Sequence, residues 1–207
     1  MGPLRHLYSR PDLLKPGGEL PVNSRYRDAA GRIAPFALYI LLLALQPALR
    51  AVLPEAYDPR WLYALQVALP LAALMYLWPG YTELRDSPMP GPQHLLLALA
   101  LGAGVFAVWI RLDFPPWVIG ESEGFDPRNE TGRLLIGLAF VRLFGATLVV
   151  PVMEELFWRS FILRWLEHPR FKGVHPSAVG VVPLLISSAL FATEHHLWLA
   201  GFLAGLA

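Results

Sequence analysis

Long apolar stretches constrain this chain more than any other feature of its sequence. A helix that spans a bilayer needs about 20 mostly apolar residues, and four or five stretches approach or exceed that length. A soluble fold would have to bury several helices that are apolar on all faces. The sequence therefore predicts an all-α fold, a polytopic bundle of transmembrane helices. The stretches run over residues 33–53, 61–78, 94–110, 134–166 and 179 to about 197.

The composition agrees with this class and excludes several others. Of the 207 residues, 55% are hydrophobic and 16% are charged, whereas soluble domains carry about 25% charged residues. This apolar excess excludes intrinsic disorder. The lack of cysteine excludes a disulfide scaffold and any cysteine-ligated zinc or iron–sulfur site. Because 17 Lys and Arg balance 16 Asp and Glu, no basic excess indicates a nucleic-acid partner.

The distribution of positive charges predicts how the chain is oriented, since Lys and Arg concentrate in cytoplasmic loops. Residues 1–32 contain six of them, and Arg164, Arg170 and Lys172 surround the junction after the fourth stretch. The loop over residues 113–132 is acidic. We therefore expect a multi-pass protein of the inner (plasma) membrane with its N-terminus in the cytoplasm. Residues 1–32 would form a partly disordered cytoplasmic segment, and residues 33–207 the transmembrane domain, with about five spans and the start of a sixth.

Ionisable residues inside the apolar stretches are the strongest pointers to function. Each costs about 2.5–3.5 kcal/mol to insert into a membrane, so such residues are rare outside functional sites. Two clusters occur, one in the fourth stretch and one at the end of the fifth. They are Glu154, Glu155 and Arg159, and Glu194, His195 and His196.

The spacing within the first cluster predicts two different roles for its carboxylates. Glu155 and Arg159 are four residues apart, so on a helix they are stacked and can form an ion pair. Glu154 lies about 100° away around the helix, outside that pair. A carboxylate in apolar surroundings has a raised pKa, which suits a general base. The alternative for the Glu155–Arg159 pair is that it only locks helix packing.

Pro151, just before this cluster, is expected to bend or break the helix and make room for water. One straight helix over residues 134–166 would be about 48 Å long, too long for a bilayer core of about 30 Å. The stretch should therefore be tilted or interrupted. We expect Glu154 and His195 to share a polar site, which requires that one of their two helices is shifted or interrupted.

The two clusters resemble the motifs of a known enzyme family. Glu154-Glu155-x-x-x-Arg159, followed in the next apolar stretch by Phe191-x-x-x-His195, is similar to the CAAX-protease and bacteriocin-processing family (CPBP, or Abi) of intramembrane endopeptidases. This family includes the type II CAAX prenyl endopeptidase, and the resemblance covers about residues 133–207. Residues 35–39, 81–84 and 109–110 also resemble the bacterial subgroup associated with exosortase and PEP-CTERM sorting systems.

The resemblance implies hydrolysis of a peptide bond in a membrane-anchored or lipidated protein substrate at the bilayer. Glu154 would be the base and His195 would position the water. Glu155 and Arg159 would be the supporting pair and Phe191 a packing residue, and we add His196 to these supporting residues. The mechanism we favour needs no cofactor. The alternative is a zinc ion, for which Glu154, Glu155 and His195 are suitable ligands.

One departure from the family pattern leaves alternatives open. The pattern continues with a further histidine and a His-x-x-x-Asn or Asp motif, whose groups would stabilise the oxyanion, whereas this chain stops at Ala207. We therefore expect a C-terminally truncated form or a degenerate member. The alternatives to a protease are an inactive membrane scaffold or adaptor of the same family and a small transporter or channel subunit. The latter predicts polar residues at helical spacing on several spans, which the second and third stretches lack.

Overall fold

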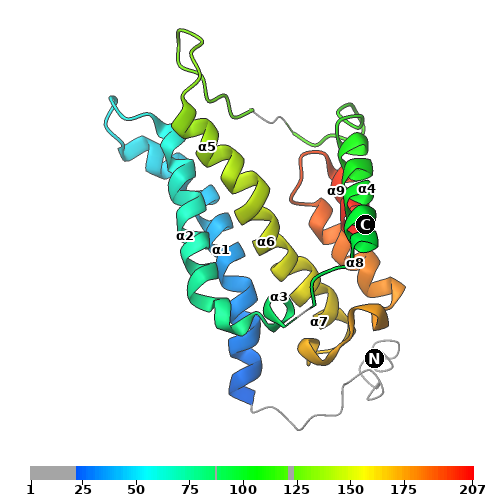
Figure 1. The fold of residues 1–207 in the computed structure, drawn as a ribbon. Helices are drawn as coiled ribbons and strands as arrows, with labels where there is room; N and C mark the ends of the chain where they lie inside the picture. Colours follow the sequence, from blue (N-terminus) through cyan, green and yellow to red (C-terminus); the bar gives the residue numbers. More distant parts are fainter. Residues whose placement is uncertain (1–21, 87, 121–123) are drawn as a thin grey trace. The chain divides into compact units, whose positions relative to one another are not determined.

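The computed structural model describes residues 22–86, 88–120 and 124–207, and these residues confirm the all-α prediction (Figure 1). Within them there is no β-strand, and the backbone pairing between Arg128 and Leu134 is an isolated bridge. The α-helices are α1 (Val22–Val52), α2 (Leu62–Leu77), α3 (Thr82–Arg85), α4 (Pro92–Trp109), α5 (Ile136–Phe144), α6 (Val150–Glu154), α7 (Leu163–Glu167), α8 (Val181–Ala192) and α9 (Trp198–Leu206).

Among the described residues, four helical runs are long and apolar enough to cross a membrane, and they correspond to the first four predicted stretches. They are Tyr26–Val52, Pro59–Gly80, Pro92–Trp109 and Ile136–Glu167. The fifth stretch is different, because α8 has 12 residues and ends at Ala192. This is shorter than the roughly 20 residues that a span requires. His195 therefore lies beyond the end of α8, in the turn that leads to α9.

Helix α1 begins at Val22, eleven residues before the predicted start of the first stretch. Of the predicted N-terminal segment, residues 1–21 lie outside the described residues, and residues 22–32 are helical. Periodic apolarity alone could not locate this start, since residues 22–32 are polar but contain no proline that would stop a helix.

The fourth run, Ile136–Glu167, is continuous, although it contains two π-helical segments, η4 (Gly145–Val149) and η5 (Glu155–Ile162). These segments flank the short helix α6, which contains Pro151. Proline has no N–H to donate to a preceding carbonyl, and a wider turn is one way for the backbone to accommodate this loss. The expected break at Pro151 is therefore replaced by a change of helical type on both sides of it.

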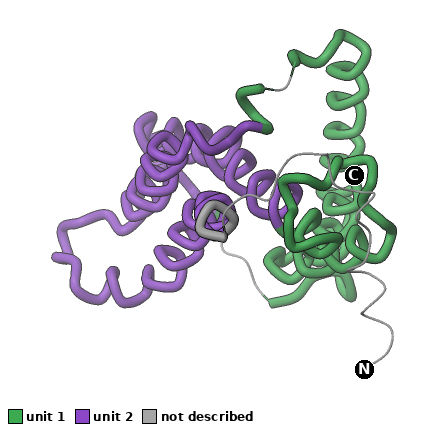
Figure 2. Tube along the Cα trace, turned by 90° about the horizontal axis from the view of Figure 1, so that it is seen from below, with its two compact units in different colours: residues 1–17, 83–124, 162–207 green, residues 18–82, 125–161 purple. Residues whose placement is uncertain are grey.

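The helices fall into two compact units, each of which we describe by itself (Figure 2). One unit, here the Glu154 unit, comprises the described residues of 18–82 and 125–161. In it α1 packs on α2 and α6, and α2 packs on α5. Its buried apolar residues include Phe36, Tyr63, Val67, Met153 and Leu156.

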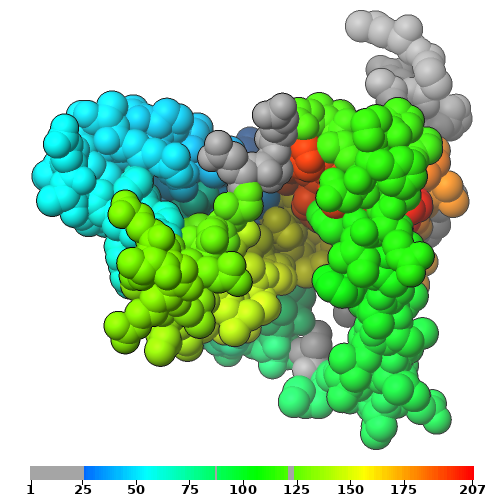
Figure 3. Space-filling model, turned by 90° about the horizontal axis from the view of Figure 1, so that it is seen from above, coloured from blue at the N-terminus to red at the C-terminus, as the bar shows by residue number. Residues whose placement is uncertain are grey.

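The second unit, the His195 unit, comprises the described residues of 83–124 and 162–207. Helix α9 packs on α8 and α4, and α7 packs on α8. The backbone N–H of Gly180, at the start of α8, donates to the Glu167 carboxylate at 2.7 Å. None of the residues of α4 is buried. Helix α4 forms part of the green column in Figure 3.

Glycines bring α9 close to α8. A Cβ on Gly205 would lie 2.9 Å from the Cα of Ser188, and one on Gly201 would lie 3.1 Å from the Cβ of His195. Gly201 and Gly205 are four residues apart and share one face of α9. This is the small-residue spacing that lets membrane helices approach closely, and it places α9 directly against the turn that carries His195.

Candidate active site

The first cluster lies at the junction of α6 and the π-helical segment η5. Glu154 is the last residue of α6, and Glu155 is the first of η5. The predicted ion pair is confirmed: Arg159 Nε lies 3.0 Å from Glu155 Oε1. The side chain of Glu155 is 60% exposed and that of Arg159 is 41% exposed. Glu155 is thus engaged by a guanidinium, while Glu154, directly before it in the chain, is half-buried.

A buried arginine of α1, which the charge distribution predicts only as a cytoplasmic charge, contacts this segment. Arg32 is 1% exposed, and its Nε donates to the Ser160 hydroxyl in η5 at 3.0 Å. Its Nη1 donates to the Asp28 carbonyl at 2.8 Å, and its Nη2 donates to the Gly80 carbonyl at 3.3 Å. A buried charge is tolerated when it is hydrogen-bonded in this way.

Pro35 explains a further contact of the same region. Since proline cannot donate to the carbonyl four residues before it, the Gly31 carbonyl is available for another donor. The hydroxyl of Tyr81 fills that role at 2.8 Å, and Tyr81 is 1% exposed. The guanidinium of Arg32 lies 5.8 Å from the centre of the Tyr81 ring. A proline in the first apolar stretch near an arginine was the available signal for this network.

Aromatic side chains complete the contact between α1 and η5. The rings of Phe36 and Phe157 are stacked, with centroids 4.1 Å apart and an interplanar angle of 6°. Trp158 meets Phe36 edge-on at 6.0 Å. Phe36 is four residues after Arg32, so both side chains project from one face of α1. That face therefore contacts η5 at a polar and at an aromatic position.

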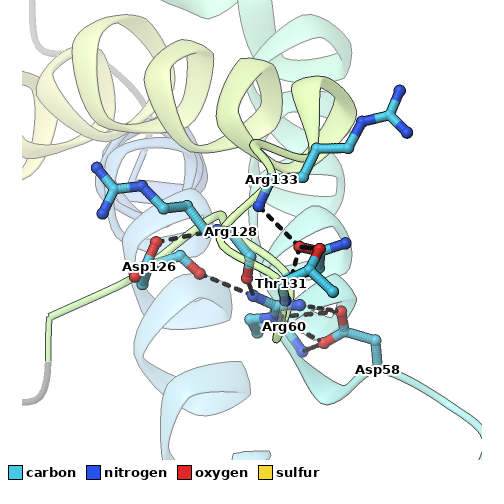
Figure 4. Close-up of polar contacts among 7 residues, drawn as sticks. Asp58, Arg60, Asp126, Arg128, Thr131 and Arg133 are labelled. Carbon is cyan, nitrogen blue, oxygen red and sulfur yellow. Dashed lines mark hydrogen bonds and ion pairs between the residues drawn. The ribbon is translucent and has the colours of Figure 1, made fainter.

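The outer end of the same unit is held by a polar loop cluster (Figure 4). Arg60 binds the Asp58 carboxylate and the carbonyl oxygens of Asp126 and Arg128. These hydrogen bonds join the connection between α1 and α2 to the connection before α5. The hydrogen bonds from Arg60 hold the pKa of Asp58 below its usual range. The Asn129 side chain accepts hydrogen bonds from the backbone N–H groups of Thr131 and Arg133.

In the His195 unit, the second motif holds its histidine in one orientation. The Nδ1 atom of His195 lies 2.9 Å from the Phe191 carbonyl oxygen. A carbonyl only accepts, so Nδ1 carries the hydrogen and donates. In the neutral ring, Nε2 is then left with its lone pair. Burial lowers the pKa of His195, which favours this neutral form at pH 7.

Two aromatic rings and one glycine lie against the imidazole of His195. The Phe191 ring, whose packing role the resemblance implied, lies 4.4 Å away between centroids. Trp109, at the end of α4, meets the imidazole edge-on at 5.1 Å. Gly201 of α9 lies against its Nδ1 side. Trp109 and Gly201 were not among the predicted site residues, because only the packing of α4 and α9 brings them to this turn.

His196 fastens the neighbouring loop. Its Nδ1 donates to the Ile119 carbonyl at 2.6 Å, and its backbone carbonyl accepts from the Ile119 N–H at 2.9 Å. Close by, the indole N–H of Trp198 donates to the Pro116 carbonyl at 3.0 Å. The contacts of His196 therefore belong to the loop after α4, and its supporting role toward catalysis stays a prediction.

Glu154 and His195 lie in different units, so their meeting at one site also stays a prediction of the sequence. Within each unit, the described residues contain no group of three His, Asp or Glu side chains that could hold a metal ion. Of the three groups predicted to ligate zinc, Glu155 is bound to Arg159. A Glu155 carboxylate held in this way is a poor fit to a zinc site.

Comparison with known families supports the resemblance. Residues 136–207 match the model of the family described as type II CAAX prenyl endopeptidase Rce1-like. The match includes both motifs, from Glu154 to Arg159 and from Phe191 to His195, and it confirms the resemblance to the CAAX-protease family for this part of the chain. It does not address the exosortase-associated subgroup. Comparisons with curated proteins and with solved structures give no match.

The Rce1-like family is a protease family, and four helical runs of this chain are suited to a bilayer. The chain is therefore a polytopic membrane protein in which residues 136–207 match the Rce1-like family.

Proposed function

We propose that this protein is an intramembrane endopeptidase that hydrolyses a peptide bond of a membrane-anchored or lipidated protein. The observation that carries the proposal is the family match over residues 136–207, which includes every catalytic and supporting residue derived from the apolar stretches. The finer assignment, in which Glu154 is the base and His195 positions the water, is supported by the chemistry of the two motifs.

The contacts of each motif suit these roles. Arg159 engages Glu155 at 3.0 Å, and Glu154 is the second carboxylate of the motif, half-buried at the end of α6. Because His195 donates from Nδ1 to a fixed backbone carbonyl, its neutral Nε2 can accept a hydrogen bond from water. Carboxylates and imidazoles are among the side chains that act as general bases and activate water in enzymes.

In the proposed reaction, Glu154 takes a proton from water while the water oxygen bonds to the scissile carbonyl carbon. The carbonyl π electrons move to its oxygen and give a tetrahedral oxyanion. When the carbonyl re-forms, the C–N bond breaks, and Glu154 returns its proton to the departing nitrogen. His195 holds the water through Nε2 during attack. The proposal takes this metal-free form because Glu155, one of the three candidate zinc ligands, is engaged by Arg159.

The test is cleavage of a membrane-anchored peptide by the protein in proteoliposomes. Glu154→Gln and His195→Ala should each lower the rate by about 10²–10⁴-fold, the usual effect of removing an acid–base group. Glu130→Gln removes an exposed loop carboxylate of the Glu154 unit and should leave the rate unchanged. All three variants should reach wild-type levels in the membrane. Full cleavage by both motif variants would refute the assignment, and loss of cleavage with a chelator would favour zinc.

An inactive scaffold or adaptor of the same family is the second candidate. The Glu155–Arg159 pair and the hydrogen bonds of Arg32 favour it to the extent that they would order helices without any chemistry. The same experiment separates the two functions. A scaffold would give no cleavage by the wild-type protein, and Glu154→Gln would not alter its other properties.

We also propose an inner (plasma) membrane location with the N-terminus in the cytoplasm, supported by the charges before the first span. Because the chain lacks cysteine, single cysteines can report the orientation without background. In intact cells a membrane-impermeant maleimide should label Glu130→Cys, and it should label Arg27→Cys only after lysis. The reverse pattern would overturn the orientation.

A further inference from the structure

Arg32 is the most fully buried charged side chain that the structure describes, and it lies beside the first motif. It is 1% exposed and donates from three nitrogens in three directions, to Ser160, Asp28 and Gly80. Two of these acceptors are backbone carbonyls of its own unit. The third acceptor is the hydroxyl of Ser160, the residue that follows Arg159 in η5.

Helix α1 contacts η5 at two positions, and Arg32 makes one of these contacts. Arg32 holds the segment at Ser160, while Phe36, one turn further along α1, stacks on Phe157 at 4.1 Å. Both contacts fall within the eight residues of the π-helical segment. Ser160 is itself buried, at 9% exposure, so the hydrogen bond from Arg32 is shielded from solvent.

A π-helical segment is an uncommon conformation that needs support from its surroundings. Within a helix, the type of turn determines how far each side chain is rotated from the one before it. Segment η5 begins at Glu155, directly after Glu154. A return of η5 to α-helical turns would therefore rotate Arg159 and Ser160 relative to Glu154. Since Ser160 is tied to α1 through Arg32, that rotation would break the buried hydrogen bond.

Arginine is suited to this task because its planar guanidinium is always charged and its donors point in fixed directions. The two carbonyl acceptors fix the plane of the guanidinium, which leaves Nε aimed at the Ser160 hydroxyl. Tyr81 lies over the same group and is anchored to the Gly31 carbonyl. The Arg32 side chain is thus oriented before it contacts η5.

We propose that Arg32 is a positioning residue, which maintains the π-helical register of residues 155–162 and thereby sets the direction of the Glu154 carboxylate. This inference rests on the proposed function for its catalytic consequence, but the hold on η5 can be measured separately. Arg32 does not act on the substrate. It acts through Ser160 and the helix backbone.

The test compares Arg32→Gln and Ser160→Ala with Arg50→Gln in proteoliposomes. Arg50 is a matched control, because it lies on the same helix and its hydrogen bond to Gln46 is exposed. For Arg32→Gln we expect kcat to fall about 100-fold, the size of effect that a misplacement of about 1 Å can cause. KM should stay within about two-fold, since the substrate contacts are not removed. Ser160→Ala should lower kcat in the same direction, and Arg50→Gln should leave it unchanged.

A second readout does not depend on activity. Hydrogen–deuterium exchange of the peptide that covers residues 155–162 should become faster in Arg32→Gln and Ser160→Ala and should match wild type in Arg50→Gln. Wild-type exchange in Ser160→Ala, or wild-type kcat in a folded Arg32→Gln protein, would overturn the inference. Should Arg32→Gln fail to fold, Ser160→Ala provides both measurements.

The failure of this inference can be told apart from the failure of the proposed function. If the wild-type protein cleaves its substrate and Glu154→Gln does not, an unchanged kcat in Arg32→Gln overturns only the positioning role. If the wild-type protein does not cleave, the proposed function fails. Faster exchange in both variants would then still support the hold of Arg32 on η5, and unchanged exchange would overturn it.

Discussion

The helix that carries Glu154 and the turn that carries His195 are held by different kinds of contact. Glu154 precedes a π-helical segment that is supported by a buried cation and by stacked rings from α1. His195 follows a short helix, and it is supported by a backbone carbonyl, two aromatic rings and a glycine of α9. The first arrangement resists rotation of a helix, because both of its contacts act at a distance from Glu154. The second orients one imidazole directly.

The two motifs should therefore respond differently to substitution of the residues that support them. A substitution near His195 displaces the imidazole itself and should directly lower the rate of cleavage. A change around η5 reaches Glu154 only through the backbone.

Among the variants Gly201→Val, Trp109→Ala and Asp58→Asn, Gly201→Val should have the largest effect on cleavage. A Cβ at this position would lie 3.1 Å from the Cβ and 3.2 Å from the Nδ1 of His195, and the extra methyl groups of valine would push the imidazole from the Phe191 carbonyl. We expect cleavage to fall about 100-fold, as for a catalytic group displaced by about 1 Å. The measurement is kcat/KM in proteoliposomes.

The control for this variant is Gly104→Val, because a Cβ at Gly104 of α4 has no atom within 4 Å. It should cleave at the wild-type rate. Equal rates for the two variants would mean that the close approach of α9 does not orient His195.

The pH profile of cleavage should show how burial affects the protonation of His195. The neutral imidazole is the active form, and burial lowers its pKa below the usual value of about 6.5. Activity should therefore persist at pH 6.5 and decline only as the pH falls through the lowered pKa. Trp109→Ala removes a ring that meets the imidazole at 5.1 Å, so it should raise this pKa and move the acid limb toward pH 6.5. An acid limb that stays in place would assign it to another group.

Asp58→Asn should have the smallest effect, because the loop cluster lies at the outer end of the Glu154 unit. The pKa of Asp58 is lowered by Arg60, so its contribution to stability is present above the unfolded-state pKa of about 4. It is lost as the pH falls through the lower folded-state value. The variant should unfold at a slightly lower temperature than wild type at pH 7, and this difference should disappear in strong acid.

Cleavage by Asp58→Asn should remain at the wild-type rate, since the supports of η5 come from α1 and not from this loop. A loss of cleavage comparable to that of Gly201→Val would show that the loop cluster positions the first motif, and it would remove the contrast between the two regions.

The local part of the candidate site could be predicted from the sequence. The ion pair between Glu155 and Arg159 follows from a spacing of four residues, and the structure has it at 3.0 Å. The π-helical type of the segment does not follow from spacing, and the residues of α1 that contact it are more than 100 residues away in sequence. For the same reason, the sequence predicts Arg32 only as a cytoplasmic charge. Its acceptor Ser160 is 128 residues away in the chain, so no local pattern indicates the hydrogen bond.

The sequence by itself determined the class of this protein and the identity of its chemical groups. Apolar length depends only on neighbouring residues, so the four long helices were predictable. The tertiary structure decided where α1 begins, that α8 ends at Ala192, and which side chains surround Arg32 and His195. These features depend on which distant backbone carbonyls, rings and glycines come together. No local pattern encodes that, because the energy of each contact exists only when both partners are in place.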